Sequence, residues 1–181
     1  MNLTLITSRE RKQDVAKKFL PDIERKNLEL KEIQSTNYFE IAEHKLKAGN
    51  KIKGNVLVDD AAFELSCLNG HPGPYAKDFV NSLGIQKIHE LVKSLKDNKA
   101  RRICTLGLRY KGKYYFFQGE TKGTIVKPSK NTKASDFDRI FIPKGYKKPM
   151  SDLPQELKDK ISHRAKAYQK LIVFLKSKGE L

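Results

Sequence analysis

The chain has 181 residues, of which 38% are hydrophobic and 32% are charged, and its formal net charge is +16. This length is enough for a substantial core, so we expect one domain over residues 1–181, with no membrane span because no apolar run approaches ~20 residues. The N-terminus lacks a signal-peptide pattern and the two cysteines lack metal-binding spacing, so we expect free thiols in a reducing cytoplasm.

The first strand is predicted at residues 2–7, where apolar and polar residues alternate. Ser8 is then a candidate N-cap for a helix that shows apolar residues at helical spacing and ends at Pro21. One more short strand and one more helix are expected before the middle of the chain, at Leu28–Leu30 and Tyr38–Lys51.

The central strand is predicted from the apolar run Val56–Val58, whose length is typical of a buried strand. Two adjacent carboxylates, Asp59 and Asp60, follow at its carboxyl end. Open α/β sheets bind their ligands at this end of their strands. We therefore favour a functional pair of acids over a solvated acidic patch.

The rest of the chain is predicted to add further strands, helices and one polar loop, which together indicate a mixed α/β fold. The expected strands are Phe63–Leu68, Cys104–Tyr110, Tyr114–Gln118, Gly123–Val126 and Phe141–Pro143. The expected helices are Gly73–Leu83, Ile85–Leu95, a turn that opens at Leu153, and a last helix that Ser162 begins; the loop is Pro128–Asp138.

The turn after the first strand, from Thr7 to Lys12, brings hydroxyl groups and a lysine to a helix N-terminus. Backbone N–H groups at such a terminus suit phosphate binding. The spacing does not match the GxxxxGK[ST] pattern of a P-loop. An ordinary strand–turn–helix connection is the alternative interpretation.

Three carboxylates, those of Glu40, Asp59 and Asp60, are candidate ligands for a magnesium ion. Mg²⁺ prefers oxygen ligands and is usually held by one or two carboxylates together with substrate phosphates. Glu40 lies in the first turn of a predicted helix, where an acid also complements the helix dipole. That structural role is the alternative for Glu40 by itself.

Two patterns in the C-terminal part offer side chains that could contact a ligand. Phe137 beside Asp138 offers a stacking surface and a polar anchor, or alternatively a core phenylalanine beside a loop acid. His163 and Arg164 offer several donors at the start of the last helix, with Lys158 shortly before them. A capped amphipathic helix with surface charges is the alternative there.

Basic residues outnumber acidic ones by eight to two between Lys122 and Lys148. Such a segment attracts polyanions, which include nucleotides and nucleic acids. A lysine-rich surface without any function is the alternative. Nucleic-acid binding therefore stays open, but we do not favour it.

Five blocks of the chain resemble, in the same order, the signature blocks of the inosine triphosphate pyrophosphatase family, the non-canonical purine NTP pyrophosphatases. The blocks are TSRERK, EIQSTNYFEIAEHKLKAG leading into VLVDDAAFELSCLNGHPGPYAKDF, QGETKGTIV, SDFDRIFIPKGY and KDKISHRAKA. The chain departs from the family pattern at Arg9, where the family has Asn, and at Ser135, Asp136 and Arg139.

The resemblance implies an elongated central mixed sheet flanked by helices, two lobes with an active-site cleft between them, and a homodimer. It implies Mg²⁺-dependent hydrolysis of ITP, dITP and XTP to the monophosphate and pyrophosphate. The alternatives are a pyrophosphatase for another modified or pyrimidine nucleotide, and a basic nucleic-acid-binding protein on the same fold.

The resemblance also implies a role for each matching residue. Asp60 is the expected catalytic base or second metal ligand, beside Glu40 and Asp59 as metal ligands. The expected phosphate-binding residues are Thr7, Ser8, Arg9, Lys12 and Lys77. The expected base-binding residues are Phe137, Asp138, Lys158, His163 and Arg164.

Overall fold

The computed structural model describes residues 2–28, 30 and 33–181. The chain forms two compact units. The first unit comprises residues 1–60, 104–119 and 166–181, and the second comprises residues 61–103 and 120–165. Because each unit takes segments from distant parts of the sequence, neither corresponds to one continuous stretch. The single domain expected over residues 1–181 stays a prediction.

Seven strands of the described chain form a mixed sheet in the order β2-β1-β3-β5-β6-β7, with β4 paired to β3. β1 is parallel to β2 and β3, whereas β4 is antiparallel to β3 and β7 is antiparallel to β6. The strands are β1 (Leu3–Ile6), β2 (Glu24–Lys26), β3 (Asn55–Leu65), β4 (Pro72–Gly73), β5 (Lys99–Tyr110), β6 (Lys113–Ile125) and β7 (Phe141–Pro143). The predicted mixed α/β class is confirmed.

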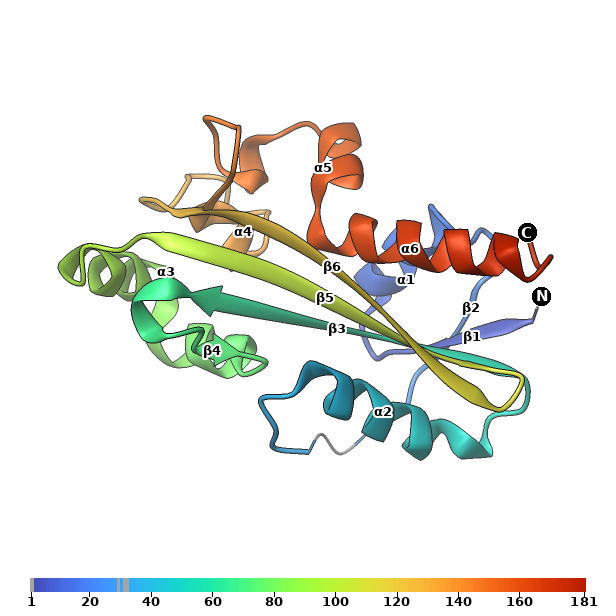
Figure 1. Cartoon of the computed structure of the whole chain (residues 1–181). Helices are drawn as coiled ribbons and strands as arrows, with labels where there is room; N and C mark the ends of the chain where they lie inside the picture. Colours follow the sequence, from blue (N-terminus) through green and yellow to red (C-terminus); the bar gives the residue numbers. More distant parts are fainter. Residues whose placement is uncertain (1, 29, 31–32) are drawn as a thin grey trace. The chain divides into compact units, whose positions relative to one another are not determined.

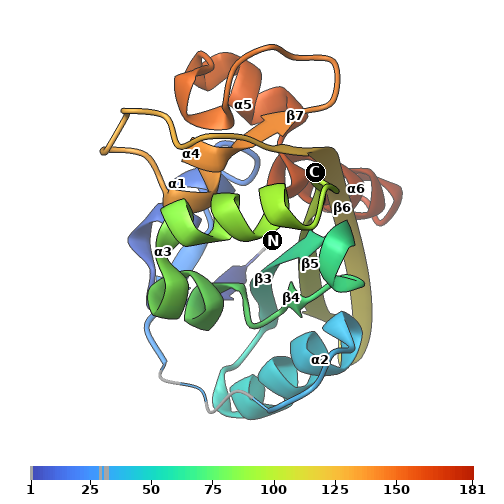
Figure 2. The ribbon, with the colours of Figure 1, turned by 90° about the vertical axis from the view of Figure 1, so that its left-hand side faces the viewer.

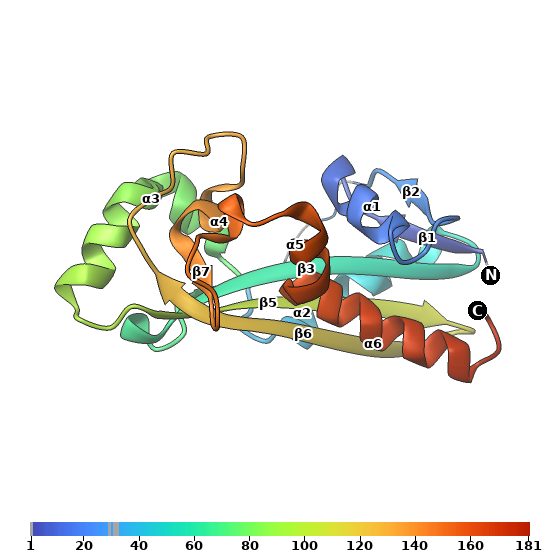
Figure 3. The ribbon, with the colours of Figure 1, turned by 90° about the horizontal axis from the view of Figure 1, so that it is seen from above.

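The first unit has helices on both faces of its strands. The helices α1 (Glu10–Lys17) and α6 (His163–Ser177) cover one face, and α2 (Tyr38–Ala48) covers the other (Figures 1 and 3). Successive strand residues point to opposite faces, so Leu57 packs in the α1/α6 core while Val56 and Val58 pack in the α2 core.

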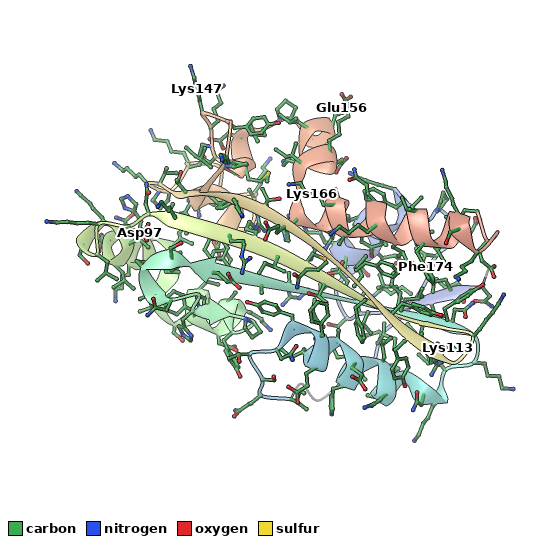
Figure 4. The ribbon with its side chains drawn as sticks, in the orientation of Figure 1. Asp97, Lys113, Lys147, Glu156, Lys166 and Phe174 are labelled. Atoms are coloured by element: carbon green, nitrogen blue, oxygen red, sulfur yellow. The ribbon has the colours of Figure 1, made fainter. Side chains whose placement is uncertain are left out.

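Aromatic side chains fill the α6 side of the first unit. Phe174 points from α6 toward the strands (Figure 4), and its ring centroid lies 4.5 Å from that of Tyr115 and 5.3 Å from that of Phe117. Both strand residues are odd-numbered and therefore share one face of β6. Tyr168 and Leu175 of the same helix are buried in this cluster, and Ile172 packs against it.

The second unit packs α3 (Ala76–Ser94) and α4 (Asp136–Ile140) against one face of its strands. Its third helix is α5 (Gln155–Ile161), and α3 is prominent in Figure 2. Ile88 and Val92 of α3 pack with Phe63 and Leu65 of β3. Gly84 interrupts α3 with a φ of 73°, which agrees with the two successive helices predicted there.

Several predicted boundaries are wrong, and the reasons are local. Arg9, not Ser8, is the N-cap of α1, because the Thr7 hydroxyl accepts the Arg9 N–H (3.1 Å) and holds the turn outside the helix. The second strand is Glu24–Lys26, a charged edge strand, where an apolar pattern is not needed. Leu28 and Leu30 lie outside it, and Glu29 lies outside the described residues.

The strand that carries the two acids is longer than predicted. β3 runs through Asp59 and Asp60 to Leu65, so these residues lie inside the strand rather than at its end. Pairing with β4, at Phe63 and Glu64, satisfies backbone groups beyond the apolar run. A 3₁₀ turn at Ser66–Leu68 replaces the end of the expected strand, and α4 begins inside the expected loop.

The pairing of β6 with β7 depends on Gly123. A Cβ atom at this position would lie 2.2 Å from the Ile142 carbonyl oxygen and 2.6 Å from Cζ of Phe141. Because a backbone oxygen cannot move away cheaply, we expect Gly123→Ala to lower the free energy of unfolding by roughly 2–4 kcal/mol. Denaturant unfolding measures this loss, with Lys122→Ala on the exposed face of β6 as control. Equal stability of the two variants would contradict the predicted clash.

None of the helices within residues 2–28, 30 and 33–181 combines the length and apolar character needed to cross a bilayer.

Candidate active site

The turn after β1 is built as a strand-to-helix connection. Thr7 is buried at the end of β1, and its hydroxyl accepts the Arg9 N–H at 3.1 Å. Ser8 and Arg9 are exposed, and α1 begins at the next residue. The first N–H groups of a helix lack intrahelical acceptors. The turn therefore presents hydroxyl, guanidinium and backbone donors to an anion.

Asp59 is a fully buried carboxylate that Lys12 holds from α1. The Lys12 ammonium donates a hydrogen bond to the Asp59 backbone carbonyl and lies 3.8 Å from its Oδ1. The Cys104 thiol lies 3.7 Å from the same Oδ1. The Asp59 side chain is 0% exposed, and a buried negative charge needs a positive group nearby, which Lys12 provides.

Asp60 points to the opposite face of β3, toward α2. The Lys45 ammonium pairs with its Oδ1. Its Oδ2 is buried and has no hydrogen-bond partner among the described residues. A buried carboxylate oxygen is costly to leave unpaired. This oxygen is therefore a position where a water molecule or a ligand would gain a strong contact.

Glu40 lies in the first turn of α2, the helix that also carries Lys45. Its carboxylate accepts a hydrogen bond from the Ser35 hydroxyl at 2.6 Å and is otherwise exposed. Asn37 caps the helix by accepting the N–H groups of Phe39 and Glu40. Asn37 therefore fixes the position of the Glu40 backbone at the start of α2.

The three predicted metal ligands do not gather into one cluster. Within the described part of the chain, no group of three His, Cys, Asp or Glu side chains is placed to hold a metal ion. Asp59 faces α1, whereas Asp60 faces α2. Magnesium usually takes only one or two carboxylates and completes its shell with phosphates and water. The unpaired oxygen of Asp60 and the exposed Glu40 fit that pattern.

In the second unit, α4 is fixed by two of the predicted base-binding residues. Asp138 is buried and forms an ion pair with Arg102 of β5. The Phe137 ring stacks on the Phe63 ring at a centroid distance of 4.1 Å. Core packing therefore accounts for one face of Phe137, and the base-stacking role of its other face stays a prediction.

The remaining candidates are His163 and Arg164 at the start of α6, Lys158 in α5 and Lys77 in α3. His163 is only 3% exposed, while Arg164 and Lys158 are half-buried. The Ser162 hydroxyl accepts the Ala165 N–H at 3.1 Å, which confirms Ser162 as the residue that begins this helix. Lys77 is separate from this group and is exposed in the first turn of α3.

Two partners of these residues were missed in the sequence, Lys45 and Arg102. Lys45 lies among the buried residues of α2, next to Leu46. A lysine on the apolar stripe of a helix indicates a buried ion pair, because a buried ammonium group needs an acidic partner. Arg102 gave no comparable signal, because its partner Asp138 is distant in sequence.

The fold and these sites define a mixed α/β protein whose first unit carries paired acids and lysines beside a turn suited to phosphate. The chain belongs to the Ham1 family, whose model matches residues 3–174. The resemblance to the inosine triphosphate pyrophosphatases is therefore confirmed.

Two relatives of this chain are both named as pyrophosphatases of purine nucleoside triphosphates. The chain is 36% identical to an inosine triphosphate pyrophosphatase of Encephalitozoon intestinalis, with 96% of this chain and 92% of that protein covered. It is 32% identical to a dITP/XTP pyrophosphatase of Ignicoccus hospitalis, covering 77% and 76% respectively. The Ham1 protein of Staphylococcus aureus has the same fold, with a TM-score of 0.84, 24% identity, and coverage of 98% and 100%.

Proposed function

We propose that this protein hydrolyses non-canonical purine nucleoside triphosphates (ITP, dITP and XTP) to the monophosphate and pyrophosphate. The observation that carries the proposal is the buried, unpaired Oδ2 of Asp60, whose other oxygen is held by Lys45. The names of the related pyrophosphatases support the substrate class.

The Asp60 carboxylate acts as general base in this proposal. With Oδ1 held by Lys45, Oδ2 accepts a proton from a water molecule. The water oxygen forms a new bond to phosphorus as the bridge between the α and β phosphates breaks, and pyrophosphate leaves. A positioned general base typically contributes ~10²–10⁴-fold to the rate.

The triphosphate is assigned to the turn after β1 and to lysines. Thr7, Ser8 and Arg9 donate to phosphate oxygens from the turn, and Lys12 and Lys77 supply positive charge. Arg9 can replace the family's Asn because a guanidinium binds phosphate with two parallel hydrogen bonds. Positive groups aimed at the leaving pyrophosphate stabilise the charge that develops in the transition state.

Glu40 would help to hold a magnesium ion at the substrate phosphates, where the ion would neutralise phosphate charge during bond cleavage. The one unpaired oxygen of Asp60 is assigned to the general base rather than to the metal. Asp59 points to the other face of β3 and pairs with Lys12, so we infer that it positions Lys12 rather than binding the metal.

Glu40→Gln tests the metal assignment. The amide keeps the size of the side chain but is a weaker ligand than a carboxylate, so we expect the magnesium concentration for half-maximal turnover to rise at least about tenfold. Glu43→Gln is the matched control on the same helix, because Glu43 only pairs with Lys47 at the surface. An unchanged magnesium titration for Glu40→Gln removes Glu40 from the metal site.

The purine is assigned to the second unit. His163 and Arg164 present donors to the acceptor O6 of inosine or xanthine, Lys158 and Asp138 contact the ring edge, and Phe137 stacks on the ring. Adenine carries an amino donor at the same position, so these donors would stay unpaired. The proposal therefore predicts discrimination between ITP and ATP.

A substrate comparison tests the proposed function. The purified protein is assayed with magnesium against ITP, dITP, XTP, the standard NTPs and a modified pyrimidine triphosphate. We expect kcat/KM for ITP and XTP to exceed that for ATP by orders of magnitude. Preferred turnover of a pyrimidine triphosphate would instead favour a pyrophosphatase for another nucleotide.

We also propose that the protein is a cytoplasmic homodimer. Two free cysteines support a reducing compartment, and the family resemblance supports the dimer. Sedimentation velocity at micromolar concentration tests the oligomeric state, and a monomer throughout that range would contradict the dimer.

A further inference from the structure

A pocket lies entirely within the second unit, and none of the proposed catalytic residues lines it. Its volume is about 760 Å³, which is in the range of small-molecule sites. Residues from β3, β5, β6, β7 and the turns after β3 and β7 line it. None of the residues assigned above to phosphate, metal or base lines this pocket.

The pocket lies on the strand face opposite the helices of the second unit. Phe63, Ile125 and Phe141 point into the α3/α4 core. Glu64, Thr124 and Ile142, their immediate neighbours in sequence, line the pocket. Successive strand residues point to opposite faces, so the pocket is built on the uncovered face. Its floor is rigid because it consists of paired strands.

Positive charge dominates the pocket. Lys99, Arg101, Lys122 and Lys144 line it, against Glu64 as the single acid. Arg101 is held by Glu64 at 2.6 Å and by Glu120 at 3.0 Å. The ammonium groups of Lys99 and Lys144 form no ion pair with residues in the described ranges. Lys122 pairs with Glu120 at 3.6 Å, so Lys99 and Lys144 are the lining cations whose charge favours an anion.

One side of the pocket is apolar and includes an aromatic ring. Ile142 and Pro143 of β7 and Tyr146 of the following turn form this side. The Tyr146 N–H donates to the Pro143 carbonyl at 3.1 Å, which fixes the turn. A tyrosine ring provides a stacking surface for a planar group. The pocket therefore combines a region for phosphate with a region for a ring.

We propose that this pocket binds a second, small phosphate-bearing ligand with a planar ring, the chemical class of a nucleotide. The phosphate lies against Lys99 and Lys144, and the ring lies against Tyr146. Binding here is separate from hydrolysis, because the pocket contains no unpaired carboxylate comparable to that of Asp60.

Titration calorimetry with IMP and with inorganic pyrophosphate tests this site. The variant is Lys99→Glu/Lys144→Glu. The matched control is Lys87→Glu/Lys93→Glu, which makes the same charge change at exposed residues of α3. We expect the variant to bind one IMP fewer per chain, or to bind it at least about tenfold more weakly, while the control binds as the wild type does.

The ring contact is tested with Tyr146→Ala. We expect this variant to weaken IMP binding but to leave pyrophosphate binding unchanged, because pyrophosphate has no ring. Equal numbers of IMP sites with equal affinities in the wild type, the charge-reversal variant and the control would overturn the proposal. A change of oligomeric state in the charge-reversal variant without loss of an IMP site would also overturn it and would mark the face as an interface between two copies.

The result of this binding experiment does not depend on whether the protein hydrolyses ITP. The readout is the number of bound IMP molecules rather than turnover, and the substituted lysines lie outside the proposed catalytic residues. If the second site is absent while ITP is hydrolysed, only this proposal fails. If the charge-reversal variant loses a site while ITP is not hydrolysed, only the proposed function fails.

Discussion

Asp60→Asn is expected to lower kcat for ITP by ~10²–10⁴-fold, the usual contribution of a positioned general base. The amide keeps the shape of the side chain and still accepts the hydrogen bond from Lys45. It cannot take a proton from water as a carboxylate does. The substitution also weakens the ion pair with Lys45. Because the Asp60 side chain is 21% exposed and that of Lys45 is 11% exposed, solvent screens part of this pair, which limits the loss in free energy of unfolding.

Two measurements separate catalysis from folding in this variant. Thermal unfolding shows whether Asp60→Asn is folded at the assay temperature. Glu10→Gln serves as the control, because it also removes an acid that pairs with a basic residue of the first unit, Arg25, but at the surface. A near wild-type kcat for Asp60→Asn would show that another group activates the water.

Arg164→Ala is expected to lower the ratio of kcat/KM for ITP to that for ATP by roughly 10–100-fold. A hydrogen bond from a charged donor contributes about 1.5–3 kcal/mol to binding. Without Arg164, inosine loses this hydrogen bond, and the adenine amino group no longer faces an unpaired donor. The expected stability change is smaller, because Arg164 is half-buried rather than a core residue. Steady-state kinetics with both nucleotides measures the ratio.

Lys166→Ala provides the control for Arg164. Lys166 is an exposed cation on the same helix, labelled in Figure 4. We expect it to leave the ITP/ATP ratio unchanged. If Arg164→Ala lowers turnover of ITP and ATP equally, Arg164 binds phosphate or supports the helix, and the donor assignment for the base is wrong.

Much of the fold follows from local patterns in the sequence. The alternation in residues 2–7 predicted β1 close to its observed bounds, and Ser162 marked the start of α6. Two helical patterns were predicted on either side of Gly84, and the positive φ of Gly84 interrupts α3 at that position. β2 was misplaced because an edge strand with charged residues carries no apolar signal. Its position depends on pairing with β1, which is a tertiary contact.

The candidate site shows the same division between local and tertiary information. The sequence placed Asp59 and Asp60 together but suggested that they follow the strand. In the structure β3 continues through them, so strand alternation sends Asp59 to Lys12 and Asp60 to Lys45. Residue spacing alone could not assign these partners, because each lies on a helix that packs against a different face.

The most direct test of the proposed function is product analysis of ITP hydrolysis by the purified protein with magnesium. Anion-exchange chromatography separates IMP from IDP, and separate assays detect pyrophosphate and orthophosphate. We predict IMP and pyrophosphate in equal amounts, with no IDP at early times, because the bond between the α and β phosphates is cleaved. Accumulation of IDP with release of orthophosphate would contradict the proposed reaction.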